Sequence, residues 1–256
     1  MLRPGLVIAL TMLAVVASPS GIGPGPPPAA ARQARPLHGV LIAIDAGHQL
    51  GNSRHPDEIN QPVPAGGFTK PCNTTGTATD AGFPEATFNF RVAMRLSSRL
   101  SNLGARVMLT RHRNSRRLWG PCVDYRGRFG NSRPATLKIS IHGDGSYSGG
   151  SGFHVIAPTD RAPWTSDIYR SSKRLARATR HGLMRSHFPV ADYIAGGDGL
   201  DFRGDLATLN LSNIPTVMVE LGNMRNSSDA AVMSSARGQG RYARALTHGV
   251  RAFLHR

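Results

Sequence analysis

The segment Val40-Leu-Ile-Ala-Ile-Asp-Ala-Gly-His48 is an apolar run that ends in an aspartate, a glycine and a histidine. A short apolar run bounded by polar residues or glycine is typical of a strand that is covered on both faces of a sheet. In open α/β sheets, ligands bind where the carboxyl ends of the strands emerge. The segment therefore predicts a central strand that carries His48 to a functional site.

Two later segments repeat this pattern. Residues 137–142 alternate apolar and polar residues up to His142 and then open into Gly-Asp-Gly. Residues 215–220 run apolar up to Glu220 and then open into Leu-Gly-Asn. Both segments have the length and apolar content of buried strands. Three strands are therefore expected to present His48, His142 and Glu220 at their ends.

A helix is predicted from Glu85 to Gly104, because proline at position 84 suits the start of a helix and glycine suits its end. One apolar stripe with the spacing of a buried helix face runs through Phe88, Val92, Leu96, Leu100 and Leu103. Glu85 lies at the head of this stripe. An acid in the first turn is common because it suits the helix dipole. An inward carboxylate, however, needs a partner, and a metal held by two histidines is such a partner.

The order of the predicted elements favours one α/β domain over residues 36–256. Strands that alternate with helices predict a mixed, mostly parallel central sheet flanked by helices, with the site at the carboxyl ends of the strands. Residues 49–83 have no periodicity and are expected to form a long surface loop of functional use. Residues 192–213 are expected to be mostly irregular. Further strands are predicted at residues 106–110 and 152–157, and helices within residues 118–131, 167–184, 228–234 and 240–254.

Residues 1–31 have the form of a secretory signal peptide followed by a linker. Arg3 precedes a short apolar run over residues 6–17, and a Gly/Pro/Ala tract follows. The alternative is a membrane anchor, but the run is shorter than the roughly 20 residues that span a bilayer. We therefore expect export to the periplasm or cell wall, with no stable membrane span after cleavage.

The chain has two cysteines, Cys72 and Cys122. An even number of cysteines in an exported protein usually indicates a disulfide. Metal binding by the pair is the weaker interpretation, because the two residues do not lie in a short Cys-x-x-Cys spacing. A disulfide between Cys72 and Cys122 is therefore predicted.

The formal net charge is +16, and most of the positive charge comes from arginine. A basic surface implies anionic partners, or serves only solubility. Nucleic acid is disfavoured because the arginines are not interleaved with an aromatic stacking platform. The anionic cell envelope is the expected partner, and the protein is expected to be a monomer.

The residue types at the predicted strand ends suit a catalytic zinc site. Such a site takes three protein ligands from His, Glu and Asp and leaves a fourth position open. His48, Glu85 and His142 satisfy this set, although a single histidine at a strand end is more often a hydrogen-bonded surface residue. His154 is a competing ligand, but it is predicted to lie inside a strand.

Four motifs occur in the order found in one enzyme family. Together they resemble the zinc-dependent N-acetylmuramoyl-L-alanine amidases of the amidase type 3 family, and the chain looks most like a mycobacterial periplasmic member. The match covers nearly all of the chain after residue 40. Gln49 and Ala86 depart from the residues usual in this family. The motifs are Asp45-Ala-Gly-His48, a helix that begins at Glu85 and leads into the strand Gly104-Ala-Arg-Val-Met-Leu-Thr-Arg111, Ser140-Ile-His-Gly-Asp144, and Val219-Glu-Leu-Gly-Asn223.

The resemblance implies an α/β domain with Zn²⁺ at the strand ends, held by His48, Glu85 and His142. It implies Glu220 as the catalytic carboxylate, which would take a proton from water and return it to the leaving amine. Asp144 is expected to orient a ligand or its loop. Asp45 is expected to do the same, or to hold the turn through backbone hydrogen bonds.

Three functions remain open at this point. The first is an exported zinc amidase that cleaves between the lactyl group of muramic acid and L-alanine of peptidoglycan stem peptides, in wall turnover or daughter-cell separation. The second is a zinc carboxypeptidase or endopeptidase that acts elsewhere on the stem. The third is a basic wall-binding protein without activity. The full ligand set together with Glu220 favours an enzyme. The interval from Asp144 to Glu220 leaves little room for a helix that blocks the site, so an open site is expected.

Overall fold

The three predicted strands lie side by side in one six-stranded sheet of the computed structural model, which describes residues 1–2 and 35–256. β1 (Leu41–Ala46), β5 (Leu137–Asp144) and β8 (Thr216–Asn223) pair in parallel. β4 (Arg106–Leu109) extends the sheet in parallel beside β1. β6 (His154–Pro158) pairs antiparallel with β8, and β7 (Leu200–Arg203) pairs with β6. The strand order is β4-β1-β5-β8-β6-β7, so the prediction of a mixed, mostly parallel sheet is confirmed.

Two of these strands run further than the sequence suggested. β5 continues two residues beyond His142, and β8 continues three residues beyond Glu220. The paired register between these strands shifts between His142 and Asp144. His142 and Glu220 face each other directly across the two strands before this shift. The side chains of His142 and Glu220 therefore project from within their strands, with paired residues before and after them.

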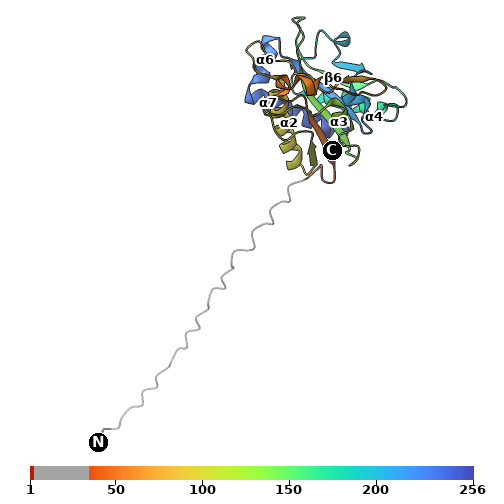
Figure 1. The fold of residues 1–256 in the computed structure, drawn as a ribbon. Helices are drawn as coiled ribbons and strands as arrows, with labels where there is room; N and C mark the ends of the chain where they lie inside the picture. The colour runs from red at the N-terminus through yellow and green to blue at the C-terminus, as the bar shows by residue number, and fades with distance from the viewer. Residues whose placement is uncertain (3–34) are drawn as a thin grey trace. The chain divides into compact units, whose positions relative to one another are not determined.

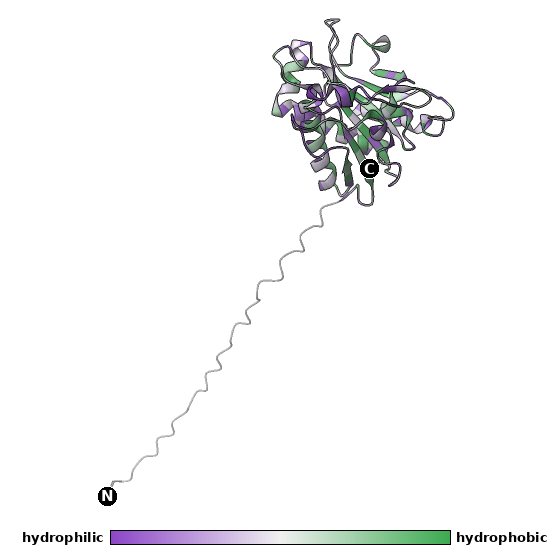
Figure 2. Ribbon diagram, in the orientation of Figure 1, coloured by the Kyte–Doolittle hydropathy of each residue, from purple (hydrophilic) through white to green (hydrophobic). Residues whose placement is uncertain are grey.

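Helices cover both faces of the sheet (Figure 1). Successive side chains of a strand point to opposite faces, so the packing of these side chains shows which helices lie on which face. On one face, α7 (Ala236–Phe253) packs against α2 (Glu85–Asn102), α4 (Tyr169–Arg185) and α6 (Ser227–Ser234). The main core lies between these helices and strand residues such as Val217 and Val219. Met218 points to the other face, where it packs with Leu209 of α5 (Ala207–Asn210). The short helix α3 (Val123–Arg128) packs on α5. Figure 2 shows the apolar strands within these layers.

Residues 49–83 are not a plain surface loop, which corrects the sequence prediction. They contain η1 (Asn52–Arg54), α1 (Pro56–Ile59) and a hairpin of β2 (Pro62–Pro64) and β3 (Thr69–Pro71). Cys72, directly after the hairpin, is fully buried and forms a disulfide with Cys122. The elements are too short for a periodic pattern, so periodicity could not reveal them. β7 and η2 (Ala195–Gly197) were missed in the region of residues 192–213 for the same reason.

The predicted signal peptide and linker at residues 1–31 lie almost entirely outside the described residues. None of the helices that the structure describes combines the length and hydropathy needed to cross a membrane. Residues 35–256 cluster as one unit, in agreement with a single α/β domain.

A buried ion pair lies beneath the carboxyl end of β1. Asp45 and Arg126 are almost fully buried, with Nη1 of Arg126 at 3.2 Å from Oδ1 of Asp45. The hydroxyls of Thr110 and Ser140 also donate to Asp45, at 2.7 and 2.6 Å. Burial raises the pKa of Asp45, but Arg126 and these hydroxyls outweigh it and hold the pKa below its usual value. Asp45 is therefore a carboxylate that fixes α3 against β1 and β5.

Replacing Asp45 with asparagine is expected to destabilise the protein by about 3–5 kcal/mol, because it leaves the buried Arg126 charge without a partner. The contribution of Asp45 to the free energy of unfolding is present above pH ~4 and is lost as the pH falls. The reason is that the folded protein keeps this carboxylate ionised at a lower pH than the unfolded chain does. Chemical denaturation at several pH values measures both effects. The control is Asp124→Asn, because Asp124 pairs with Arg128 on the surface and its loss is expected to cost less than about 1 kcal/mol. Equal effects from the two variants would contradict this account.

The disulfide closes a loop of 50 residues. A cross-link of this span stabilises a fold by about 4 kcal/mol in the chain-entropy model. The double variant Cys72→Ser, Cys122→Ser is therefore expected to unfold at a lower denaturant concentration than the oxidised protein, by up to this amount. Reduction of the unmodified protein is expected to reproduce the shift and to leave its metal content unchanged. Two free thiols in the purified protein, counted by thiol titration, would contradict the assignment.

Candidate metal centre

The structure brings the three predicted ligands, His48, Glu85 and His142, together at the carboxyl ends of β1 and β5. Oε2 of Glu85 lies 3.3 Å from Nε2 of His48, and Oε1 of Glu85 lies 3.0 Å from Nδ1 of His142. One ligand atom from each of the three residues lies within 4.8 Å of the other two. The two imidazole rings are almost perpendicular, with centroids 4.9 Å apart. A single carboxylate thus bridges two imidazoles.

Glu85 is the first residue of α2 and is held by several hydrogen bonds. The backbone amides of Thr77 and Gly143 and the side-chain amide of Asn89 donate to its two oxygens, at distances from 2.9 to 3.2 Å. Burial raises the pKa of Glu85, yet the two histidines favour the carboxylate, and the pKa lies well below its usual value. Glu85 is therefore an anion in a fixed orientation, as a metal ligand must be.

His48 is held in a left-handed backbone conformation, with φ of 56°. Its Nδ1 lies 3.1 Å from the backbone oxygen of Thr74, and its Nε2 lies 3.3 Å from Oε2 of Glu85, so both ring nitrogens face acceptors and the orientation of the ring is fixed. Arg126 donates to the backbone oxygen of His48 at 3.0 Å. Asp45 therefore acts on this turn through Arg126 and not through backbone hydrogen bonds of its own.

Gly47 permits the close approach of the two histidine-bearing segments. A Cβ at this position would lie 2.4 Å from Cε1 of His142. That separation is far below a van der Waals contact, so any side chain here would displace the ring. The glycine of the Asp-Ala-Gly-His sequence is therefore a steric requirement of the site.

The donor set fits a divalent metal. Two imidazole nitrogens and one carboxylate oxygen form the protein part of many catalytic zinc sites, which leave a further position open for water or substrate. The carboxylate is ionised, as metal binding requires, and the ring of His48 is held with Nε2 toward Glu85. The arrangement can therefore hold a metal ion and keep one side of it accessible.

Glu220 lies beside this group, on β8. It faces His142 on β5 and His154 on β6 in the paired registers. Burial raises the pKa of Glu220 well above its usual value, and the negative charges of Glu85 and Asp144 raise it further. Among the described residues, none forms a hydrogen bond with its buried Oε2. Glu220 is thus a carboxyl group with a raised pKa and one buried oxygen that has no partner among the described residues.

His154 is the residue at the site that sequence reasoning placed least well. It was predicted to lie inside a strand, but it begins β6 and faces Glu220. Its Nδ1 is buried and has no hydrogen-bond partner among the described residues. Burial is the main reason that its pKa lies below the usual value. The difference arises because β6 begins at residue 154, two residues later than predicted.

Among the described residues, Asp144 forms no hydrogen bond with His48, Glu85 or His142. It accepts hydrogen bonds from the backbone amide of Gly145 at 2.6 Å and from the hydroxyl of Tyr193 at 2.9 Å. Asp144 therefore orients its own loop, which is one of the two roles expected for it. Tyr193 comes from the segment predicted to be irregular, and no local sequence signal marks it.

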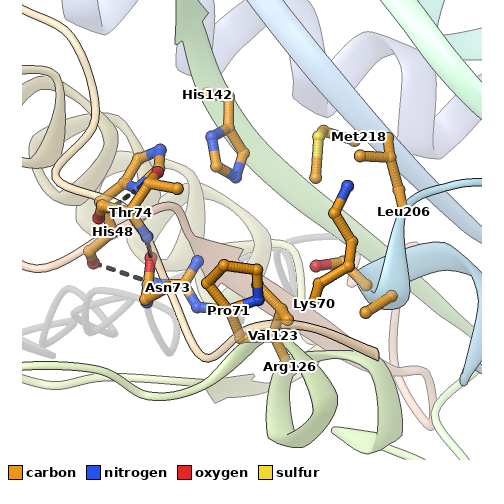
Figure 3. Close-up of a pocket in the computed structure, with 12 residues that line it drawn as sticks. His48, Lys70, Pro71, Asn73, Thr74, Val123, Arg126, His142, Leu206 and Met218 are labelled. Atoms are coloured by element: carbon orange, nitrogen blue, oxygen red, sulfur yellow. Dashed lines mark hydrogen bonds between the residues drawn. The ribbon is translucent and has the colours of Figure 1, made fainter. Parts of the chain in front are cut away.

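A cavity of about 220 Å³ opens beside the bridged group (Figure 3). His48 and His142 form one wall, and Lys70 and Pro71 of the hairpin form another. Val123, Leu206 and Met218 make much of the lining apolar. Residues 49–83 thus supply part of the cavity wall, so this long segment lies at the site.

Comparisons with known proteins agree with this arrangement. The sequence model of the amidase type 3 family, described as N-acetylmuramoyl-L-alanine amidase, matches residues 42–252. An N-acetylmuramoyl-L-alanine amidase of Mycobacterium tuberculosis is 42% identical over 220 residues, which are 85% of this chain and 88% of that protein.

Two solved structures are also similar. The N-acetylmuramyl-L-alanine amidase of Mycobacterium smegmatis has a TM-score of 0.79 and 38% identity, over 86% of this chain and 98% of that one. The apo form of the amidase of Mycobacterium abscessus has a TM-score of 0.79 and 40% identity, over 85% of this chain and 100% of that one. The chain is therefore an enzyme that belongs to the amidase type 3 family, the N-acetylmuramoyl-L-alanine amidases.

Proposed function

We propose that this enzyme is an exported zinc amidase that cleaves the bond between the lactyl group of N-acetylmuramic acid and L-alanine of peptidoglycan stem peptides. Wall turnover or daughter-cell separation is the proposed role. The observation that carries the proposal is the group of His48, Glu85 and His142, with Glu220 beside it. One Zn²⁺ per chain is the proposed cofactor, since the donor set matches catalytic zinc sites.

When bound, a catalytic zinc ion lowers the pKa of water and polarises the substrate carbonyl. His48, Glu85 and His142 are the proposed ligands, and each is oriented by a further contact. Thr74 fixes the ring of His48, and the amides around Glu85 fix its carboxylate. The proposed ligands are therefore preorganised, which lowers the free energy needed to arrange the site for the reaction.

Glu220 is the proposed general base and general acid. Its Oε2 has no partner among the described residues, so it can accept a proton from the attacking water. The raised pKa then suits return of that proton to the amine of the leaving L-alanine. The adjacent cavity is proposed to bind the substrate near the scissile bond, since its apolar lining suits small aliphatic groups and the ammonium of Lys70 suits a carboxylate.

Export is proposed from the form of residues 1–31 and from the disulfide, because stable disulfides form in oxidising compartments. The catalytic domain is proposed to cover residues 36–256 and to act as a monomer in the periplasm or cell wall. Muropeptides and the anionic cell envelope are the proposed partners.

Digestion of purified soluble muropeptides identifies the bond that is cut. The isolated protein is expected to release intact stem peptides with a free L-alanine amine, without a second protein, because the cavity beside His48 and His142 is open. Mass spectrometry of the products measures this. Loss of terminal D-alanine would indicate a carboxypeptidase instead. A zinc-loaded protein that stays inactive until another protein is added would contradict the open site.

Variants of the ligands and of Glu220 are expected to separate metal binding from turnover. His142→Ala should lose both, because two remaining ligands do not make a stable zinc site. Glu220→Gln should keep one zinc per chain and lose turnover by about 10²- to 10⁴-fold, because the amide cannot accept the proton. Elemental analysis and muropeptide turnover measure the two effects.

The matched control is Glu58→Gln. Glu58 is a carboxylate on α1 that pairs with His55, away from the bridged group. This variant should keep both zinc and turnover. Near-normal turnover of Glu220→Gln would show that the role assigned to Glu220 is wrong.

A further inference from the structure

The helical layer on one face of the sheet has an unusual charge. α4 carries six Lys or Arg residues and α7 carries four, and neither helix carries an acid. α2 carries three arginines, and its one acid, Glu85, is buried at the metal centre. α7 packs against both α2 and α4. We call the outer surface of these three helices the arginine face.

The positive charges of the arginine face are not neutralised within the protein. Of the ion pairs among the described residues, none includes an arginine of α2, α4 or α7. His248 on α7 shows the result, because burial and then the charges of nearby arginines lower its pKa. Those arginines come from all three helices and are Arg185, Arg251, Arg244 and Arg99. A surface with charge of one sign repels itself and attracts anions.

A hollow of about 470 Å³ lies on this face, at the carboxyl ends of α4 and α7. His181, Arg185 and His248 line it, together with Arg251 and His255. Arg251 donates to the backbone oxygen of Arg256 at 2.9 Å, so part of this rim is occupied by the end of the chain. Arg256 also lines the hollow and donates to the backbone oxygen of Pro36 at 3.4 Å. Among the described residues, none forms a hydrogen bond with the side chains of His181, Arg185, His248 or His255, and guanidinium and imidazole groups donate to phosphate and carboxylate oxygens.

Among the described residues, the face has few free apolar side chains for insertion into a bilayer and lacks free rings for stacking on the bases of a single-stranded nucleic acid. Its exposed large apolar residues are Met94 and Met184. The ring of Tyr169 is paired with the ammonium of Lys173, and the ring of Phe253 with the guanidinium of Arg174. Binding at a bilayer interface uses free aromatic and aliphatic side chains, and single-stranded nucleic acid uses rings on which bases stack. A linear polyanion that carries carboxylate or phosphate groups needs neither.

We propose that the arginine face binds the anionic polymer of the intact cell wall and so holds the catalytic domain on its substrate. The identity of the polymer rests on the proposed function, whereas the polyanion chemistry rests on the face itself. α2 joins the two regions, because it begins at Glu85 in the metal centre and carries Arg99 about 20 Å further along its axis. A chain bound along the face stays within that distance of the site.

The test compares two variants that each carry four substitutions and have equal net charge. Both are made in a Glu220→Gln background so that the wall is not digested. The first replaces Arg177, Arg185, Arg237 and Arg244 of the face with glutamine. The second replaces Arg54, Arg113, Arg117 and Arg133, which lie outside the three helices and form no ion pair. All eight side chains are exposed. Binding is measured by co-sedimentation with purified cell walls from low to high salt, and thermal melting checks the fold of each variant.

The face variant is expected to bind walls at least about tenfold more weakly at low salt, with a shallower dependence on salt. The second variant should bind like the parent. Equal losses in both variants would show that only the net charge matters, and no loss in either would show that the face is not used. Both results would overturn the proposal.

Two further measurements separate this proposal from its alternatives. Binding of the parent to phosphatidylglycerol vesicles or to DNA as tightly as to walls would overturn the assignment to the wall polymer. In the catalytically intact background, the face variant should turn over soluble muropeptides at the parent's rate. If the parent itself cut no muropeptide, the proposed function would fail, while the binding comparison would still decide the role of the face.

Discussion

The buried carboxylate of Glu85 between the imidazoles of His48 and His142 is the interaction on which the site depends. An anion with almost no solvent access is costly unless charged or hydrogen-bonding partners surround it. Here the partners come from the carboxyl ends of β1 and β5 and from the first turn of α2. The same three elements form the centre of the sheet and its main helical cover. The fold and the metal centre are therefore stabilised by one set of contacts.

A second layer of polar contacts keeps His48 in a backbone conformation that a histidine rarely adopts. Arg126 links the backbone oxygen of His48 to the buried carboxylate of Asp45, and Thr74 fixes the ring. Lys138, fully buried on β5, donates to backbone oxygens near the end of α3 and so holds the helix that carries Arg126. Burial lowers the pKa of Lys138 to about 7. This network explains why so many charged groups lie beneath the site.

The sequence predicted the strands because their signals are local, and the resemblance to the amidase type 3 family implied the combination of His48, Glu85 and His142. An apolar run followed by His48, and an acid at the head of an apolar helix stripe, each occupy fewer than 20 residues. The contacts that orient these residues are not local: Thr74 reaches His48 across 26 positions, and Arg126 across 78. They come from segments without periodicity, which is why the hairpin, β7 and the position of His154 opposite Glu220 could not be predicted. Specific long-range pairing appears only in the folded chain.

The central claim is that one metal ion is bound between His48, Glu85 and His142. Anomalous diffraction from crystals of the zinc-loaded enzyme, measured on both sides of the zinc absorption edge, tests it most directly. The account predicts one strong anomalous peak within about 2.0–2.2 Å of two imidazole nitrogens and a Glu85 oxygen. A peak at any other group of residues, or none between these three in a protein that contains stoichiometric zinc, would contradict it.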